Sequence, residues 1–487
     1  MANLSLKQKA IRGGFWVFLA RIVSRVFSFL RLVILARLLM PEDFGLTGVA
    51  LLSLATLETF SETGFNQALI QKKKNIENYL DTAWTVLIFR GIILFAVLYL
   101  VAPYAAIFFD APLAKPIIQV IGLSILFQAF TNIGVIYFQK ELEFNKQFIY
   151  QLSGALADFI VAISAALILR SVWALVFGLL AGSIARLLVS YFLHPWRPKL
   201  DLNLGKAKEL FSFGKWILGS SILVFLITQG DDIFVGKLLG VAALGFYQMA
   251  YRISNAPATE ITHVISQVTF PAYSKLQDNL PGLREGYLKT LQLTAFISIP
   301  LAAGIFILAP EFTEIFLTQK WLPMVPAMQA LALAGLIRSI AATAGPVFYA
   351  VGKPRLDTRW QVVRLIVLAA SIYPLTLQWG ILGASIAVCL SILISTIGFS
   401  FMVIKTTRCG IKNFGKMIIL PLVSGIIMVS VIFALKTSVN TLGIWEFLLF
   451  ALAGSLAYLA ITYLQDRFLN YGIWSLTKES LAAFRGV

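Results

Sequence analysis

The sequence predicts an all-α, polytopic membrane protein with about 14 transmembrane helices, forming two six-helix halves followed by two C-terminal helices. Three observations support this prediction. Of the 487 residues, 59% are hydrophobic and only 13% are charged, and the mean hydropathy of +0.84 is far above that of soluble domains. Apolar stretches long enough to cross a bilayer recur along the whole chain. The first of these stretches is repeated 200 residues later.

The apolar stretches define the expected transmembrane helices. Each approaches or exceeds the roughly 20 residues that a helix needs to span the hydrocarbon core. The first is retained rather than cleaved as a signal peptide, because arginines interrupt it and no small-residue cleavage site follows. In chain order the expected spans are 14–38, 44–70, 82–109, 115–139, 147–169, 172–193, 213–238, 243–271, 288–317, 325–351, 360–378, 380–404, 415–435 and 442–465.

The internal repeat divides the chain into domains. Six expected spans separate the two copies, so both halves insert in the same orientation, related by an axis along the membrane normal. The last two spans have no counterpart in the repeat. We expect an N-terminal bundle over 1–193, a cytoplasmic linker over 194–211, a C-terminal bundle over 212–404, and two extra helices with a cytoplasmic tail over 405–487. The matched pairs are Gly14 and Gly214, Trp16 and Trp216, Leu38 and Leu238, Leu39 and Leu239, Gly45 and Gly245, and Ala50 and Ala250.

Basic residues set the expected orientation. If the N-terminus is cytoplasmic, the inner segments hold dense clusters, such as the lysines at 72–74 and the basic residues of the 194–211 linker. The outer loops hold only Lys115, Arg170, Lys320 and Lys436. The positive-inside rule therefore places both termini in the cytoplasm. This placement also accounts for the net charge of +17 without a nucleic-acid partner.

The first span carries three arginines inside its apolar run, namely Arg21, Arg25 and Arg31. At 100° per residue, all three project from one sector about 120° wide, so one face of this helix is cationic. An arginine at the centre of a lipid-exposed helix costs roughly 2.5–3.5 kcal/mol on the translocon scale. We therefore expect this face to line a wet cavity enclosed by protein. Arg252 and Arg338 lie similarly deep in later spans and are assigned to the same cavity.

Arginines near the cytoplasmic ends of spans have a simpler interpretation. Arg90, Arg186 and Arg364, like Lys215, lie within about two turns of an expected inner end. Their long side chains can snorkel to water from there. We assign them to the membrane interface rather than to the cavity.

Acidic residues inside expected spans include Glu58, Glu62, Asp158, Asp231 and Asp232, with Glu260 and Glu446 in later spans. Most are expected to balance arginines. A site that couples transport to Na⁺ or H⁺ is the alternative, for which Asp231 and Asp232 are best placed. Because Asp231 replaces Arg31 in the repeat, we also hypothesise that these two residues pair, with Asp232 as the alternative partner, to close an outer gate when the cavity faces the cytoplasm.

The sequence lacks the motifs of covalent chemistry. It contains no GxxxxGK phosphate loop, no HExxH zinc motif and no cysteine pair, and the outer loops are too short for a catalytic domain. We predict neither a metal nor an organic cofactor. The GxxxG motif from Gly178 to Gly182 is expected to pack helices within one chain rather than to mark a dimer interface.

Two segments resemble a known family. LARLLMPEDFG at 35–45 with GFNQALIQ at 64–71, and DDIFVGKLLGVAALGFYQMAYRI at 231–253, are similar to the polysaccharide transporter family of the multidrug/oligosaccharidyl-lipid/polysaccharide exporter superfamily. The likeness to Wzx-type flippases covers essentially the whole chain. It implies two pseudo-symmetric bundles around a central cavity, with the arginines of the first and eighth helices holding a diphosphate.

The resemblance implies a function in the bacterial inner membrane. The expected substrate is an undecaprenyl-diphosphate-linked oligosaccharide, moved from the inner to the outer leaflet by alternating access for exopolysaccharide, colanic acid-like or O-antigen synthesis. Membrane lipid, a polysaccharide polymerase and chain-length proteins are the other expected partners. Alternatives are a multidrug/cation antiporter of the same superfamily, a flippase for a lipid-linked peptidoglycan precursor, a membrane glycosyltransferase and a non-transporting scaffold. A cation exporter would be expected to have an acidic cavity.

Overall fold

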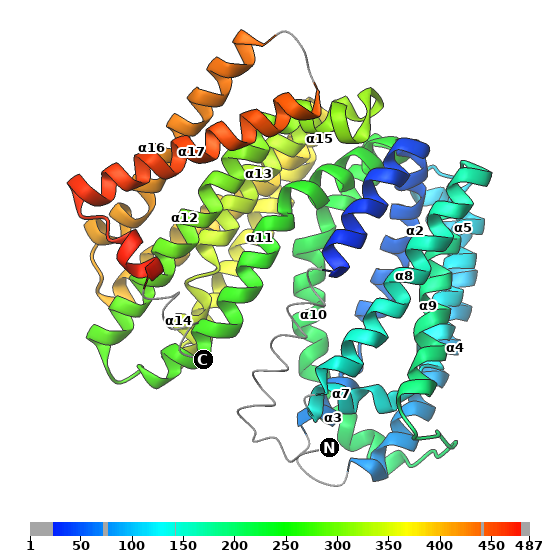
Figure 1. The fold of residues 1–487 in the computed structure, drawn as a ribbon. Coiled ribbons are helices and arrows are strands. Elements are labelled where there is room, and N and C mark those ends of the chain that lie inside the picture. The colour runs from blue at the N-terminus through cyan, green and yellow to red at the C-terminus, as the bar shows by residue number, and fades with distance from the viewer. Residues whose placement is uncertain (1–22, 72–75, 142, 440–442, 479–487) are drawn as a thin grey trace. The chain divides into compact units, whose positions relative to one another are not determined.

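The computed structural model describes residues 23–71, 76–141, 143–439 and 443–478, in which all regular secondary structure is helical (Figure 1). Short 3₁₀ or π segments interrupt the helices at Ile133–Val135, Thr313–Leu317 and Gln319–Met324. After a helix over 23–38, the α-helices are α2 (Pro41–Phe60), α3 (Phe65–Gln71), α4 (Glu77–Phe108), α5 (Ala114–Ile121), α6 (Leu123–Ala129), α7 (Ile136–Lys140), α8 (Phe144–Leu169), α9 (Trp173–Leu193), α10 (Leu204–Leu239), α11 (Val241–Lys275), α12 (Leu280–Phe312), α13 (Val325–Ala341), α14 (Gly345–Ala350), α15 (Pro354–Thr407), α16 (Ile411–Ser438) and α17 (Ile444–Leu469).

Several of these helices can span a membrane. Within the described residues, nine are long and apolar enough, or ten if the segments Ala114–Ala129 and Ile133–Lys140, bent by 70° at their junction, form one span. The prediction of an all-helical, multi-pass membrane protein is therefore confirmed, but the expected count of about 14 is not reached in this part of the chain. One reason is that α15 counts once, although the non-helical angles of Trp379 and Gly380 divide it into two helices.

The chain forms two compact units, which meet in sequence at Gly245 and Phe246. The N-terminal unit extends beyond the linker expected at 194–211, because α10 packs against α2, α3 and α4. The C-terminal unit contains most of α11 and the helices that follow it.

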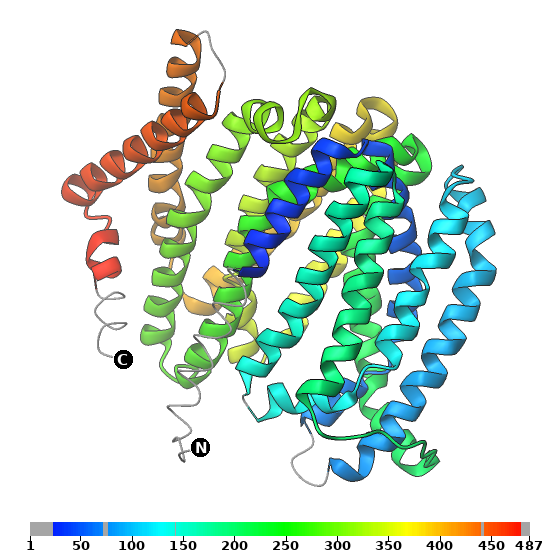
Figure 2. The same ribbon diagram turned by 45° about the vertical axis from the view of Figure 1, so that its right-hand side comes forward.

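In the N-terminal unit, α8 and α9 pack closely along their length and run side by side in both views (Figure 2). Glycines make this approach possible. A Cβ atom at Gly178 would lie 2.6 Å from Ala162 Cβ, and one at Gly182 would lie 2.8 Å from the Gly154 carbonyl oxygen. The GxxxG motif therefore packs two helices of the same chain, and this prediction is confirmed.

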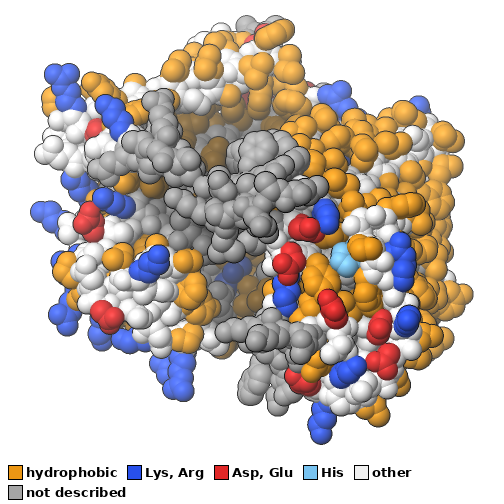
Figure 3. All heavy atoms as spheres, turned by 60° about the horizontal axis from the view of Figure 1, so that its bottom comes forward, with side chains coloured by type: hydrophobic (Ala, Val, Ile, Leu, Met, Phe, Trp, Pro, Cys, Tyr) orange, Lys and Arg blue, Asp and Glu red, His pale blue; other side chains and the backbone are white. Residues whose placement is uncertain are grey.

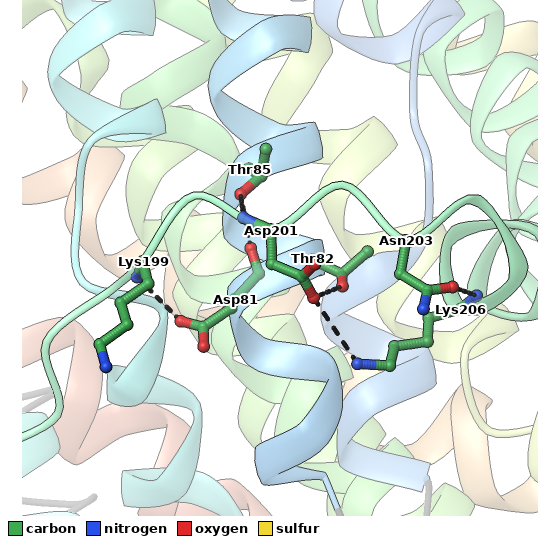
Figure 4. Close-up of polar contacts among 7 residues, drawn as sticks. All are labelled: Asp81, Thr82, Thr85, Lys199, Asp201, Asn203 and Lys206. Carbon is green, nitrogen blue, oxygen red and sulfur yellow. Dashed lines mark hydrogen bonds and ion pairs between the residues drawn. The ribbon is translucent and has the colours of Figure 1, made fainter.

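An extended segment over residues 194–203, which we call the strap, connects α9 to α10 in the N-terminal unit. The strap forms hydrogen bonds with the first turns of α4 (Figure 4). Lys199 N donates to Asp81 Oδ1 at 2.9 Å, and Asp201 N donates to Thr85 Oγ1 at 3.0 Å. In return, Thr82 Oγ1 donates to Asp201 Oδ2 at 2.8 Å. The strap is thus fixed by hydrogen bonds of both its backbone and its side chains.

In the C-terminal unit, α12 packs against α13 and α16, and α13 packs against α15. The two halves of α15 meet in a tight turn. Gly380 has φ of +58° and ψ of −136°, a conformation that glycine adopts at little cost. A Cβ atom at Gly383 would lie only 1.9 Å from the Leu375 carbonyl oxygen. Glycine at both positions therefore allows the helices to be joined without a loop.

The last two helices form a layer on α12. Ile299 of α12 is buried in one cluster with Met428 and Ile432 of α16 and Phe450 of α17. Lys436 Nζ forms an ion pair with Glu311 Oε1 at 2.5 Å. Apolar packing and this partly buried charge pair together fix α16 to the unit.

The molecular surface has the composition expected of a membrane protein. Hydrophobic side chains cover the right-hand flank in Figure 3, whereas charged side chains gather on the face toward the viewer. Leu100 and Ile107 of α4 are 68% and 71% exposed, and Ile168 of α8 is 81% exposed. Large apolar side chains at this density of exposure are stable when lipid rather than water surrounds them.

Candidate functional site

A cavity of about 570 Å³ lies inside the C-terminal unit. We call it the arginine cavity. Its wall includes polar residues from the C-terminal end of α13, from the short helix α14 and from the first half of α15: Arg338, Tyr349, Asp357, Gln361 and Arg364. The break between α13 and α14 shapes this wall. Pro346 occupies the first turn of α14, where a missing N–H does no harm, but it would interrupt a continuous helix.

Arg338 contributes an uncompensated charge to the arginine cavity. Its Nη1 donates to the Tyr251 hydroxyl at 3.3 Å, and its Nη2 donates to Thr259 Oγ1 at 3.0 Å. Its Nε is buried without a hydrogen-bond partner among the described residues. Both partners are neutral, so they orient the guanidinium group without cancelling its charge. A guanidinium group in this setting favours a phosphate or carboxylate ligand.

Asp357, the one carboxylate among the described residues that line the arginine cavity, has a neutral partner as well. The Tyr349 hydroxyl donates to Asp357 Oδ2 at 3.0 Å. Asp357 lies in the first turn of α15, where the helix dipole stabilises a negative charge. The described residues of this wall thus include two guanidinium groups and one carboxylate.

A second cavity, of about 350 Å³, lies inside the N-terminal unit, and we call it the polar cavity. Glu58 and Glu62, two predicted site residues, line it together with Arg90. Arg90 Nε donates to the Ser61 carbonyl oxygen and Arg90 Nη2 to Ser61 Oγ, both at 2.8 Å. Arg90 Nη2 also donates to the Glu58 carbonyl oxygen at 3.1 Å. Arg90 therefore binds the C-terminal end of α2, where helix carbonyls lack internal partners.

Arg31 and Asp158, also predicted site residues, form an ion pair in the N-terminal unit. Arg31 Nη2 donates to Asp158 Oδ1 at 2.9 Å. Phe27 packs edge to face on Phe159 with ring centroids 5.2 Å apart, so the helix over 23–38 and α8 are neighbours. The sequence hypothesis paired Arg31 with Asp231 instead. The repeat relates the heights of equivalent residues, but it does not predict which helix packs beside the first.

The other predicted site residues lie elsewhere. Arg25 and Arg252 are exposed on their helices. Asp231 is only 2% exposed within α10, and Asp232 is partly buried. Arg21 lies outside the described residues.

Two arginines, Arg90 and Arg364, were expected at the membrane interface, whereas the structure places both in cavity walls. A signal for Arg364 was present in the sequence. Asp357, Gln361 and Arg364 follow the i, i+4, i+7 spacing that puts residues on one helix face, and a polar face on an apolar helix indicates a polar neighbour.

The chain is similar to characterised proteins over most of its length. The family model described as "Polysaccharide biosynthesis protein" matches residues 34–326. The lipopolysaccharide biosynthesis protein WzxC of Escherichia coli (strain K12) is 27% identical over 404 residues, which is 82% of each chain.

Two solved transporter structures have a similar fold. The inward closed conformation of the lipid II flippase MurJ superimposes with a TM-score of 0.77, covering 93% of this chain and 98% of that chain at 18% identity. An inward-facing multidrug resistance MATE family transporter of the MOP superfamily has a TM-score of 0.61, covering 79% of this chain and 95% of that chain at 17% identity. At these identities the likeness shows the fold alone.

Proposed function

Because the chain belongs to the polysaccharide biosynthesis protein family, we propose that it carries undecaprenyl-diphosphate-linked oligosaccharide repeat units across the bacterial inner membrane. The Wzx-like flippases within the exporter superfamily form this family, so the resemblance predicted from the sequence motifs is confirmed. The chain is accordingly a transporter and not an enzyme. The direction of transport that we propose is from the inner to the outer leaflet, by alternating access.

The arginine cavity carries this proposal. A lipid diphosphate presents about two negative charges, and Arg338 offers a guanidinium group held by hydroxyls rather than by a carboxylate. Arg364 lies in the same wall. Guanidinium groups bind phosphate oxygens through two parallel hydrogen bonds, which supplies both charge and geometry. We propose that these two residues contact the diphosphate.

Several finer features belong to the same proposal. Further contacts to the diphosphate would come from Arg21, Arg25, Arg31 and Arg252. Asp231 and Asp232 would couple transport to Na⁺ or H⁺. Both termini would lie in the cytoplasm, and the complete chain would cross the membrane about 14 times as repeated bundles over 1–193 and 212–404, around a central cavity and with two extra helices.

The charge of the arginine cavity separates the proposal from one alternative. A multidrug exporter for cationic compounds would need a wall with net negative charge, and two arginines against one aspartate give the opposite sign. A flippase for a lipid-linked peptidoglycan precursor would share the diphosphate. Only the carbohydrate attached to the lipid distinguishes these two substrates.

Binding of sugar-free undecaprenyl diphosphate tests the proposal. In purified protein, Arg338→Ala should weaken binding by about tenfold to a hundredfold, because a hydrogen bond to a charged group contributes roughly 1.5–3 kcal/mol. Arg338→Lys should lie in between, since a lysine keeps the charge but loses the planar fork. Native mass spectrometry of the detergent-solubilised protein can measure all three affinities.

Arg359→Ala is the matched control. Arg359 is an exposed arginine of α15 that lies outside the wall of the arginine cavity. It should leave the affinity for undecaprenyl diphosphate near that of the parent protein. Equal losses in Arg338→Ala and Arg359→Ala would show that surface charge, rather than the cavity, attracts the lipid, and the proposal would fail.

A further inference from the structure

We propose that the polar cavity of the N-terminal unit binds sugar residues of the transported lipid-linked oligosaccharide. This inference rests on the proposed function and assigns a separate site to the carbohydrate. The cavity measures about 350 Å³, within the range of small-molecule sites.

Amide side chains from three different helices line the polar cavity. Gln128 comes from α6, Gln139 from α7 and Gln147 from α8. None of these three side chains forms a hydrogen bond with another described residue. Each amide offers two N–H donors and a carbonyl acceptor. Such a set matches a ligand whose hydroxyl groups both donate and accept, which is the chemistry of a sugar.

The charges of the polar cavity argue against a simple cation site. Glu58 and Glu62 bring two carboxylates, but Arg90 is fixed beside them by three hydrogen bonds to the end of α2. A bound Na⁺ would have to lie near this guanidinium group, which repels it. The described residues contain no group of three or more His, Cys, Asp or Glu side chains that could hold a metal ion. A neutral polyol can use the carboxylates and the arginine together.

The polar cavity also offers an apolar surface. Tyr150 and Phe65 lie in its wall, along with aliphatic side chains such as Ile125 and Ile136. The face of a sugar ring carries C–H groups, which pack well on aromatic and aliphatic surfaces. A wall that contains both polar and apolar groups can therefore contact both the edge and the face of a pyranose.

The experiment compares two lipids and one free sugar. The probes are sugar-free undecaprenyl diphosphate, the undecaprenyl-diphosphate-linked repeat unit from the host, and the same repeat oligosaccharide released from its lipid. The double variant Gln128→Ala/Gln147→Ala should bind the glycosylated lipid about tenfold more weakly, the loss expected for one or two hydrogen bonds. Its affinity for the sugar-free lipid should not change. Saturation-transfer NMR with the free oligosaccharide should lose signal in the same variant.

Gln151→Ala is the matched control, because Gln151 lies one turn further along α8 and is exposed. It should behave as the parent protein in all three assays. Two results would overturn the sugar site. The double variant could bind the glycosylated lipid as tightly as the parent protein does, or it could lose the same amount of affinity for both lipids. If the parent protein binds neither lipid, the proposed function fails, and the free oligosaccharide then decides the sugar site alone. Na⁺-dependent binding that Glu58→Gln abolishes, with unchanged sugar discrimination, would identify a coupling site instead.

Discussion

Gly45 and Gly245 approach each other's helices in a reciprocal contact within the N-terminal unit. A Cβ atom at Gly45 would lie 1.8 Å from the Val241 carbonyl oxygen, and one at Gly245 would lie 2.0 Å from the Pro41 carbonyl oxygen. Each glycine thus faces the residue that stands four positions before the other. The sequence repeat already pairs these two glycines. The structure adds that the equivalent residues touch, so the first turns of α2 and α11 are related by a local two-fold symmetry.

Replacing either glycine should destabilise the protein. In Gly45→Ala and Gly245→Ala the added methyl group would overlap a backbone carbonyl oxygen of the other helix. This overlap should lower the free energy of unfolding by about 1–3 kcal/mol or more. Gly219→Ala is the control, since no atom lies within 4 Å of the added Cβ at this position of α10. It should be neutral or slightly stabilising. Thermal unfolding in detergent measures the difference, and equal midpoints for Gly45→Ala and Gly219→Ala would contradict the contact.

The Arg31–Asp158 ion pair should show coupling in a double-mutant cycle. Both side chains are mostly buried, at 20% and 25% exposure, so the interaction is only partly screened. Arg31→Asp and Asp158→Arg should each lower stability, and the exchanged pair should recover about 0.5–3 kcal/mol of the summed loss. The combination Arg31→Asp/Asp231→Arg provides the comparison. If that combination recovers more stability than the Arg31–Asp158 exchange, the pairing of Arg31 with Asp231 would be favoured.

Lys436→Met should be strongly destabilising. It leaves Glu311 charged at 6% side-chain exposure, with Oε2 already lacking a hydrogen bond. Breaking one side of a buried pair costs about 3–5 kcal/mol. The double variant Lys436→Met/Glu311→Gln should recover much of this loss, whereas Lys289→Met, which breaks the exposed i,i+4 contact to Glu285, should cost less than about 1 kcal/mol. A small effect of Lys436→Met in unfolding experiments would show that water reaches Glu311.

Stability should fall on acidification because of His194. Burial lowers the pKa of this residue below its usual 6.5, and the nearby positive charges of Lys146 and Arg197 act in the same direction, against Glu143. The unfolded chain then binds more protons, so the contribution of His194 is complete above pH 6.5 and is lost as the pH falls through the folded-state pKa. His194 Nδ1 accepts a hydrogen bond from Trp196 N at 3.2 Å, which a protonated ring cannot do.

Unfolding midpoints at pH 7.5 and 5.5 test this expectation. The parent protein should lose more stability between the two values than His194→Gln, which cannot titrate. A similar loss in both proteins would assign the acid sensitivity to other groups.

Hydropathy predicted the helical class and most helix positions, because membrane insertion depends on the local composition of each segment. The packing role of the Gly178–Gly182 motif was also predictable, since small residues four apart lie on one helix face. By contrast, the partner of Arg31 depends on which helix packs beside the first. Tertiary packing decides which helix lies there, and the internal repeat alone does not predict it.

The cavities were only partly predictable. Arg338 was assigned to a cavity from its depth in the span, but Arg364 and Arg90 were not, because their positions near helix ends also fit snorkelling. Arg90 lies in the wall of the polar cavity and donates hydrogen bonds to backbone carbonyls at the end of α2. The depth of a residue within an expected span indicates whether its charge can reach the membrane surface. It does not predict where a short or broken helix leaves a cavity.

The hydrogen bonds of the strap limit where the chain can be cut or extended between its two repeats. Half of residues 194–203 are polar and two are prolines, a composition that protein engineers choose as an insertion point for reporters or as a place to split a polypeptide. Asp201 and Lys199 instead continue the hydrogen bonding of the first turns of α4. Tolerance of insertions follows backbone bonding rather than polarity. A tag or a permuted terminus is therefore better placed away from this segment, which behaves as part of the helical framework it crosses.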